Sequence, residues 1–119
     1  MDLEKLAFPA TNLKHVHAPR HRAGEYFLRG PIPMAWLNAA ARASGAGAGI
    51  KVALVLWFLS GVKRQARTFK LEPGALRRIG VDRHAGYRGL QRLEKAGLVS
   101  VQRRAGQAPT VTLLEVPKP

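Results

Sequence analysis

An almost uninterrupted apolar stretch, IKVALVLWFL, occupies residues 50 to 59 and limits how the chain can fold. Nine of these ten residues are apolar, so a helix here would be apolar on nearly all sides and must be covered by other elements or by a second subunit. The run without any polar residue, 52 to 59, has eight residues, whereas a membrane-spanning helix needs about 20. The stretch therefore predicts the central helix of a folded domain, with no membrane partner.

A second helix is expected before this stretch. Pro31 and Pro33 can open it, its alanine-rich sequence favours it, and Gly45 can end it, so we place it over residues 32 to 43. The glycine-rich residues 44 to 49 follow. They lack the spacing of a phosphate-binding loop and come after a helix instead of a strand, so they predict a flexible loop between two helices.

Shorter elements are expected after the apolar stretch. Residues 68 to 71 permit one short strand, and residues 72 to 80 permit a short helix in which Leu76 and Ile79 face inward. The segments LVSVQRR and TVTLLEV, joined by AGQAP, are rich in β-branched residues and predict a hairpin over residues 98 to 116.

Two glycines lie inside a predicted helix of about residues 82 to 96. Asp82 can cap this helix and Gly97 can end it. Gly86 and Gly89 should each cost about 0.5–1 kcal/mol relative to alanine. At 100° per residue, one side of the helix holds both glycines together with Leu90, Leu93, Ala96 and Gly97. Both glycines therefore belong to the buried face, where close packing against neighbouring helices can offset their cost.

The opposite face of the same helix is polar and basic. It carries His84, Tyr87, Arg88, Gln91 and Lys95, with Arg83 and Arg92 on its flanks. Nine of the 15 residues from 82 to 96 are charged, His, Tyr or Gln, but only Asp82 and Glu94 are acidic. A solvated surface normally mixes both signs, so this face suggests a binding role.

The charge of the whole chain points the same way. It has 20 Lys and Arg against 7 Asp and Glu, a formal charge of +13. Residues 61 to 119 hold 13 of the basic and 4 of the acidic residues. Polyanions are the natural partners of such a chain, nucleic acid before an anionic membrane surface.

The order of helix, helix, short strand, helix, turn, helix and hairpin, with LEPGALRRIGVDRHAGYRGLQRLEKAGLVSVQRRAGQAPTVTL, resembles a winged helix-turn-helix DNA-binding domain of the bacterial regulator type. The most specific part is LQRLEKAGLVSVQRR. It matches that family's run of Leu-x-x-Leu-Glu-x-x-Gly-Leu-Val at Leu90, Leu93, Glu94, Gly97, Leu98 and Val99. The resemblance covers roughly residues 50 to 116. It implies a mainly α fold with a small β-hairpin wing, in the α+β class.

The resemblance also implies roles for individual residues. A recognition helix of about residues 82 to 96 would enter the major groove, and a wing around residues 103 to 109 would touch the adjacent backbone or minor groove. The candidates for base contact are Arg83, His84, Tyr87, Arg88 and Gln91, since Arg can read guanine and Gln adenine. The candidates for phosphate and wing contact are Arg77, Arg78, Arg92, Lys95, Arg103, Arg104 and Gln107.

We therefore expect one winged helix-turn-helix domain over residues 31 to 116, after a basic arm or irregular lead-in at 1 to 30 and before a tail at 117 to 119. The expected function is sequence-specific binding of double-stranded DNA by a small transcriptional regulator. Alternatives are a replication or partition accessory protein of a mobile element, an RNA-binding basic protein, and a winged helix used for protein contact. Trp57 and Phe58 on an all-round apolar helix also leave room for a homodimer.

Other classes of function find little support in the sequence. The chain has no cysteine, which excludes disulfides and thiolate metal sites. His15, His17 and His21 have no carboxylate near them in sequence, so no metal site is expected, although their basic arm could follow DNA. The seven carboxylates form no evident acid/base pair, so neither an enzyme nor a cofactor is expected. No signal-peptide-like segment opens the chain, and a cytoplasmic location is expected.

Overall fold

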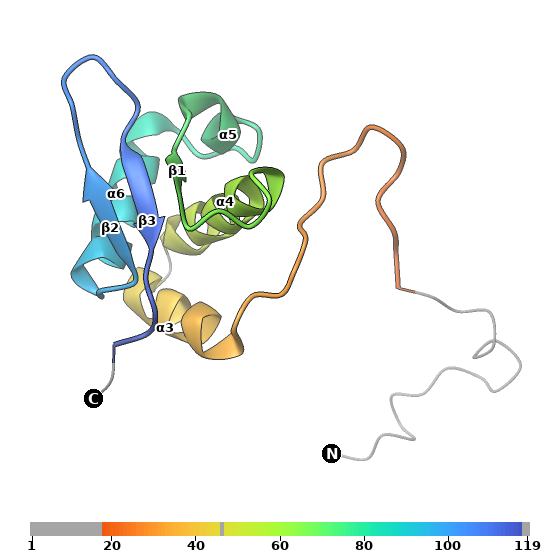
Figure 1. Cartoon of the computed structure of the whole chain (residues 1–119), viewed down its shortest axis with the longest axis horizontal. Helices are drawn as coiled ribbons and strands as arrows, with labels where there is room; N and C mark the ends of the chain where they lie inside the picture. Colours follow the sequence, from red (N-terminus) through yellow and green to blue (C-terminus); the bar gives the residue numbers. More distant parts are fainter. Residues whose placement is uncertain (1–17, 46, 118–119) are drawn as a thin grey trace, which may run out of the picture.

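The apolar stretch forms helix α4 (Gly49–Val62), which lies at the centre of the helices in the computed structural model (Figure 1). The structure describes residues 18–45 and 47–117. Val52, Ala53 and Leu56 of α4 are completely buried, and α4 contacts α3, α5, α6 and β1. The prediction of a central helix is confirmed, and elements of the same chain cover its inner sides.

Helix α3 (Met34–Ser44) precedes α4 and ends as the sequence predicts. Gly45 has φ of +56°, and its N–H donates to the carbonyl of Ala41 at 3.2 Å. The prediction of a flexible glycine loop over residues 44 to 49 is wrong at both ends, because Ser44 is the last residue of α3, Gly49 is the first residue of α4, and both are buried. A β-carbon on Gly49 would collide with the side chain of Ser44, so this glycine permits a close turn between the two helices.

Helix α5 (Pro73–Arg77) is shorter than the sequence suggests, and the expected inward position of Ile79 is wrong. Gly80, with φ of +75°, donates its N–H to Arg77 O at 3.1 Å, and Val81 donates its N–H to Leu76 O at 3.1 Å. This pair of hydrogen bonds is a Schellman motif, which ends the helix and folds Val81 back toward Leu76. Ile79 is consequently 40% exposed, whereas Val81 is 3% exposed and fills the core position.

Three short strands form one antiparallel sheet in the order β1-β3-β2. They are β1 (Thr68–Lys70), β2 (Val99–Gln102) and β3 (Thr110–Leu113). Val111 of β3 lies opposite both Phe69 and Val101. The predicted β2–β3 hairpin and the strand near residue 68 are confirmed. Their union into one sheet, with the last strand in the middle, was not part of the prediction.

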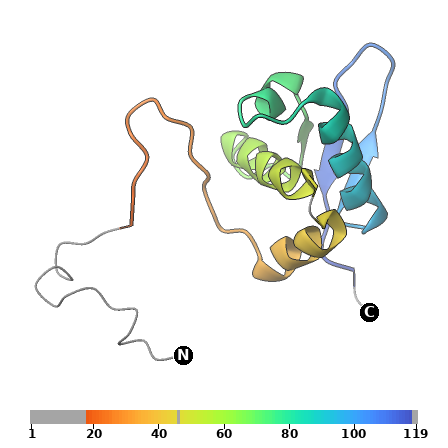
Figure 2. The same cartoon turned by 180° about the vertical axis from the view of Figure 1, so that it is seen from behind.

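The helices cover one face of this sheet (Figures 1 and 2). The alternation of strand side chains explains this arrangement, because Phe69, Val111 and Leu113 are buried, while Thr68 and Thr112 join their hydroxyls at 3.0 Å on the exposed face. Helix α6 (Arg83–Lys95) completes the helical layer and contacts α3, α4, α5 and β2. The α+β class predicted from the sequence is therefore observed.

The segment before α3 contacts the outer side of the helices around Tyr26. Residues 18–33 contain no helix or strand, and the remainder of the predicted arm, residues 1–17, lies outside the described residues. Tyr26 packs edge-on against Phe58 of α4, with ring centroids 5.6 Å apart. The guanidinium carbon of Arg78 lies 4.3 Å from the centre of the Tyr26 ring. These contacts hold the segment against α4 and the end of α5.

Candidate functional site

Helix α6 is fixed at both ends by its own sequence. The Asp82 carboxylate accepts a hydrogen bond from the Ala85 N–H at 2.8 Å, as the sequence predicts for an N-cap. At the other end Gly97, with φ of +77°, donates to Glu94 O at 3.0 Å, and Leu98 donates to Leu93 O at 3.1 Å. This is a second Schellman motif. The helix bounds therefore match the predicted 82 to 96 to within one residue at each end.

Replacing Asp82 with alanine is expected to lower the free energy of unfolding by about 1 kcal/mol, because one orphan N–H of α6 loses its acceptor. Asp82→Asn keeps an acceptor at the same position and serves as the control. Urea denaturation of the three proteins measures the difference. Equal losses from Asp82→Ala and Asp82→Asn would show that the cap hydrogen bond is not the cause.

The two interior glycines of α6 are buried, as predicted. A β-carbon on Gly86 would lie 2.7 Å from the Leu76 Cδ1 atom, which is the movable end of a side chain. A β-carbon on Gly89 would lie 3.0 Å from the Cα atom of Gly49. Of these two glycines only Gly89 therefore faces the backbone of another helix, at Gly49 of α4.

The face of α6 opposite the glycines is exposed to solvent. Its exposed residues include all five of the predicted base-contact candidates, Arg83, His84, Tyr87, Arg88 and Gln91, together with Lys95. His84, Arg88, Gln91 and Lys95 follow each other at spacings of four, three and four residues, so they form one stripe along the helix. The stripe is about 16 Å long at 1.5 Å per residue.

The two carboxylates nearest this stripe, Asp82 at the N-cap and Glu94 in α6, already have hydrogen-bond partners in the protein. Asp82 is held by its cap hydrogen bond. Glu94 receives both arms of Arg103, at 3.1 Å and 3.4 Å. The exposed stripe therefore combines cations with hydrogen-bond donors, and its nearest acids on the same helix already have partners.

The loop between β2 and β3, residues 103–109, stands beside α6. The two-pronged contact of Arg103 with Glu94 connects the start of this loop to the helix. Within the loop, the Gln107 N–H donates to Arg104 O at 3.1 Å, and Gly106 has φ of +76°. Arg104 and Gln107 remain exposed. Two charged or polar side chains of the predicted wing set are thus exposed on the loop beside α6.

Two hollows separate the loop from α6, and both are lined by Tyr87 and Gln107. The hollow toward α5, of about 620 Å³, is also lined by Arg77 and Arg83. The other, of about 290 Å³, is also lined by Gln91 and Arg103. Arg83 Nε donates to the Tyr87 hydroxyl at 3.2 Å, which links two of the predicted base-contact residues. The structure therefore brings residues of α5, α6 and the loop to one surface.

Two of the predicted phosphate contacts lie elsewhere. Arg78 turns toward Tyr26 on the outer side of the helices, away from its neighbour Arg77. Arg92 donates to the carbonyl of Ser44 at 2.9 Å, at the end of α3. The arginine thus satisfies a terminal carbonyl of another helix. The sequence offers no sign of this contact, because the two residues are 48 positions apart.

Gly49 is the residue of this site that the sequence argument missed. It sits behind α6, where the missing side chain of Gly89 brings α6 against the Gly49 backbone, while the missing side chain of Gly49 makes room for Ser44. The sequence did contain a signal for it. Gly49 directly precedes an apolar stretch whose helix must be closely covered by other elements.

The described part of the chain contains no candidate metal site and no helix that could span a membrane. Among residues 18–45 and 47–117, no three His, Asp or Glu side chains are grouped so that they could hold a metal ion. His21 instead stacks on Phe27, with ring centroids 3.6 Å apart, and His15 and His17 lie outside the described residues. Within the same described ranges, no helix has the length and apolar character to cross a membrane.

Comparisons of the chain with protein-family models, with curated proteins and with solved structures found no match.

Proposed function

We propose that this protein binds double-stranded DNA in a sequence-specific manner through a winged helix-turn-helix domain, and acts as a small transcriptional regulator. Helix α5, the Gly80 turn and α6 would be the helix-turn-helix, and the β2–β3 loop would be the wing. The observation that carries the proposal is the exposed stripe of His84, Arg88, Gln91 and Lys95 on α6, whose neighbouring carboxylates are already paired.

The dimensions of α6 suit a major groove. The groove of B-DNA, about 12 Å wide, admits one α-helix. A stripe of about 16 Å could face about five base pairs at 3.4 Å each. Arg88 and Gln91 can make two-pronged hydrogen bonds to guanine and adenine respectively, and Arg83, His84 and Tyr87 lie beside them.

The environment of the basic residues divides them into two groups. We assign phosphate contacts to the basic or polar residues that are exposed near α6 or on the loop, which are Arg77, Lys95, Arg104 and Gln107. Arg92 and Arg103 already bind Ser44 and Glu94, and we assign them the positioning of α6 and of the loop. Arg78 faces Tyr26 and receives no role on DNA.

Selection of bound duplexes from a random library tests the proposal. One enriched sequence should outcompete bulk duplex by at least about 10³. A palindromic sequence would in addition indicate a two-fold dimer on DNA. Comparable affinity for a structured RNA in the same competition would reject the proposal in favour of an RNA-binding protein. Absence of any enriched sequence would reject sequence specificity.

A further inference from the structure

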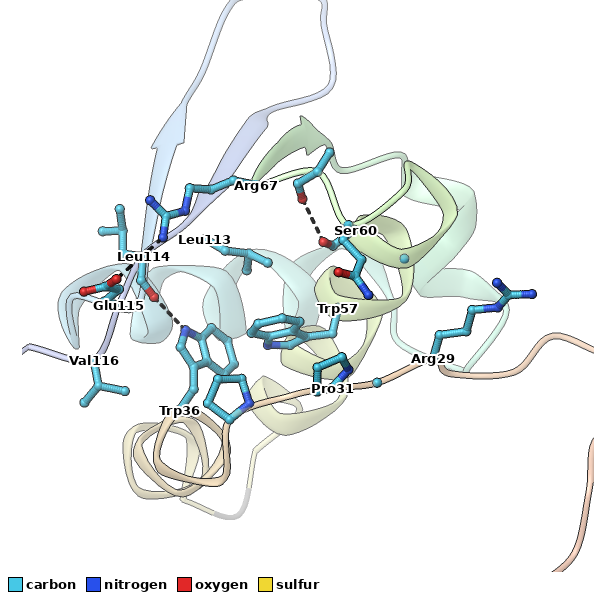
Figure 3. Close-up of a pocket in the computed structure, with 15 residues that line it drawn as sticks. Arg29, Pro31, Trp36, Trp57, Ser60, Arg67, Leu113, Leu114, Glu115 and Val116 are labelled. Atoms are coloured by element: carbon cyan, nitrogen blue, oxygen red, sulfur yellow. Dashed lines mark hydrogen bonds and ion pairs between the residues drawn. The ribbon is translucent and has the colours of Figure 1, made fainter.

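A cavity of about 440 Å³ lies on a different part of the molecule from the stripe of α6 (Figure 3). It is bounded by the segment leading into α3, by α3 and α4, and by the chain that follows β3. None of its lining residues belongs to α5, α6 or the β2–β3 loop. Its volume lies in the range of about 300–1,000 Å³ that small-molecule sites occupy.

Aromatic and aliphatic side chains form the walls of this cavity. Trp36 and Trp57 meet edge to face, with ring centroids 5.3 Å apart and planes at 88°. Figure 3 shows Pro31 beside Trp57, and Leu113 on the other side of the indoles. Flat apolar groups pack well against such walls, because aromatic rings favour edge-to-face and offset contacts.

One hydrogen-bond donor of these walls has no acceptor in the part of the chain that the structure describes. The Trp36 indole N–H donates to Leu114 O at 3.0 Å, and the Ser60 hydroxyl donates to Ala66 O at 2.7 Å. The Trp57 indole N–H is buried and has no partner among the described residues. An indole nitrogen can only donate, and a buried polar group without a partner requires an explanation. A bound molecule would supply an acceptor only with a shift of the indole, because the nitrogen itself has no accessible surface.

A cation stands at the edge of the cavity. The nearest contact of Arg67 with Glu115 is long, at 3.9 Å, and their side chains are 67% and 90% exposed. Such a pair contributes little to stability. The Arg67 guanidinium can therefore exchange Glu115 for the carboxylate of a bound molecule. The turn before it holds Arg64 and Gln65 at φ of +58° and +61°, and Gln65 also lines the cavity. Left-handed residues other than glycine carry strain of about 1–3 kcal/mol and gather at ligand sites.

We propose that this cavity binds a small planar aromatic carboxylic acid. The ring of the acid would lie against Trp57, since Trp36 is 2% exposed and offers no free face. The carboxylate of the acid would pair with Arg67. A carboxylate accepts hydrogen bonds and matches the two-pronged geometry of a guanidinium. The proposal does not depend on the DNA-binding function, because none of the residues assigned to DNA lines the cavity.

The two tryptophans provide a direct measurement on the full-length protein. They are the only tryptophans of the chain, so a proton–nitrogen correlation spectrum holds two indole N–H peaks, and both report on the cavity. Trp57→Phe assigns them. Addition of benzoate should shift both peaks. The shifts should reach saturation and give a Kd of about 1 mM or tighter. Benzamide, which keeps the ring and lacks the charge, should bind at least about tenfold more weakly.

Two substitutions at the cavity edge should act in opposite directions. Arg67→Gln should weaken benzoate binding about tenfold. Glu115→Gln removes the competing carboxylate and should tighten binding about two- to fivefold. Arg42→Gln removes an equal charge from the last turn of α3, at a residue that does not line the cavity, and should leave benzoate binding unchanged. Unsaturable shifts, equal binding of benzoate and benzamide, or an Arg67→Gln protein that binds like the wild type would each overturn the proposal.

Discussion

Replacing Gly89 with valine is expected to lower the free energy of unfolding by about 3 kcal/mol, the upper end of the usual cost of overpacking. Its β-carbon would start 3.0 Å from both the Gly49 Cα atom and the Val52 Cγ2 atom, and two further methyl groups have no room between α6 and α4. Backbone atoms of Gly49 cannot turn aside as a side chain does. The melting temperature should fall by about 12–24 °C, at 4–8 °C per kcal/mol for a domain of this size.

Gly74→Val is the matched control for this change. Gly74 is also a helical glycine, but a β-carbon there would meet nothing within 4 Å. Valine has a slightly better helix propensity than glycine, so the control should change stability by less than about 0.5 kcal/mol. Gly86→Val should lie between the two, because its obstacle is the movable end of Leu76. A Gly89→Val protein as stable as Gly74→Val would contradict the packing explanation.

Removing the Arg88 side chain is expected to weaken binding to the selected duplex by about 5- to 150-fold, equivalent to about 1–3 kcal/mol. The loss should be confined to duplexes with the preferred base at one position, because a base contact carries the sequence information. Arg88 is exposed at the middle of the α6 stripe, so the folded state should be unaffected. Titration of the preferred duplex and of single-base variants measures the effect.

Arg104→Ala provides the contrasting pattern on the same surface. It should weaken binding to all duplexes alike and lower the slope of log affinity against log salt by about one unit. Lys63→Ala removes the same charge at the far end of α4, about 20 Å along the helix from Gly49, and should leave binding unchanged. If Arg88→Ala changed the salt slope and Arg104→Ala changed base preference, the roles of α6 and the loop would be reversed.

The sequence predicted those parts of the fold that depend on neighbouring residues. Asp82 and Gly97 bound α6 because caps act within a few positions of the chain. The same kind of reasoning placed Ile79 wrongly. Its spacing of three from Leu76 would put both on one face of a helix, but the Schellman motif at Gly80 ends α5 before Ile79.

Contacts between distant residues were beyond such reasoning. The bond from Arg92 to Ser44 and the approach of Gly89 to Gly49 depend on how the helices cross, which no local pattern encodes. The same applies to the contact of Arg78 with Tyr26. For the candidate site, periodicity alone was enough to find the exposed face of α6, but it could not tell which arginines already have partners inside the protein.

The position of β3 in the sheet has a consequence for biosynthesis. β1 and β2 do not pair with each other, and both pair with β3, the last strand along the chain. While the chain is being translated, β1 and β2 therefore have no strand partner until residues 110–113 have left the ribosome. One four-residue segment then completes both pairings together. Formation of the sheet thus waits until β3 has emerged, and a nascent chain stalled before Thr110 would leave two strand edges open to other chains.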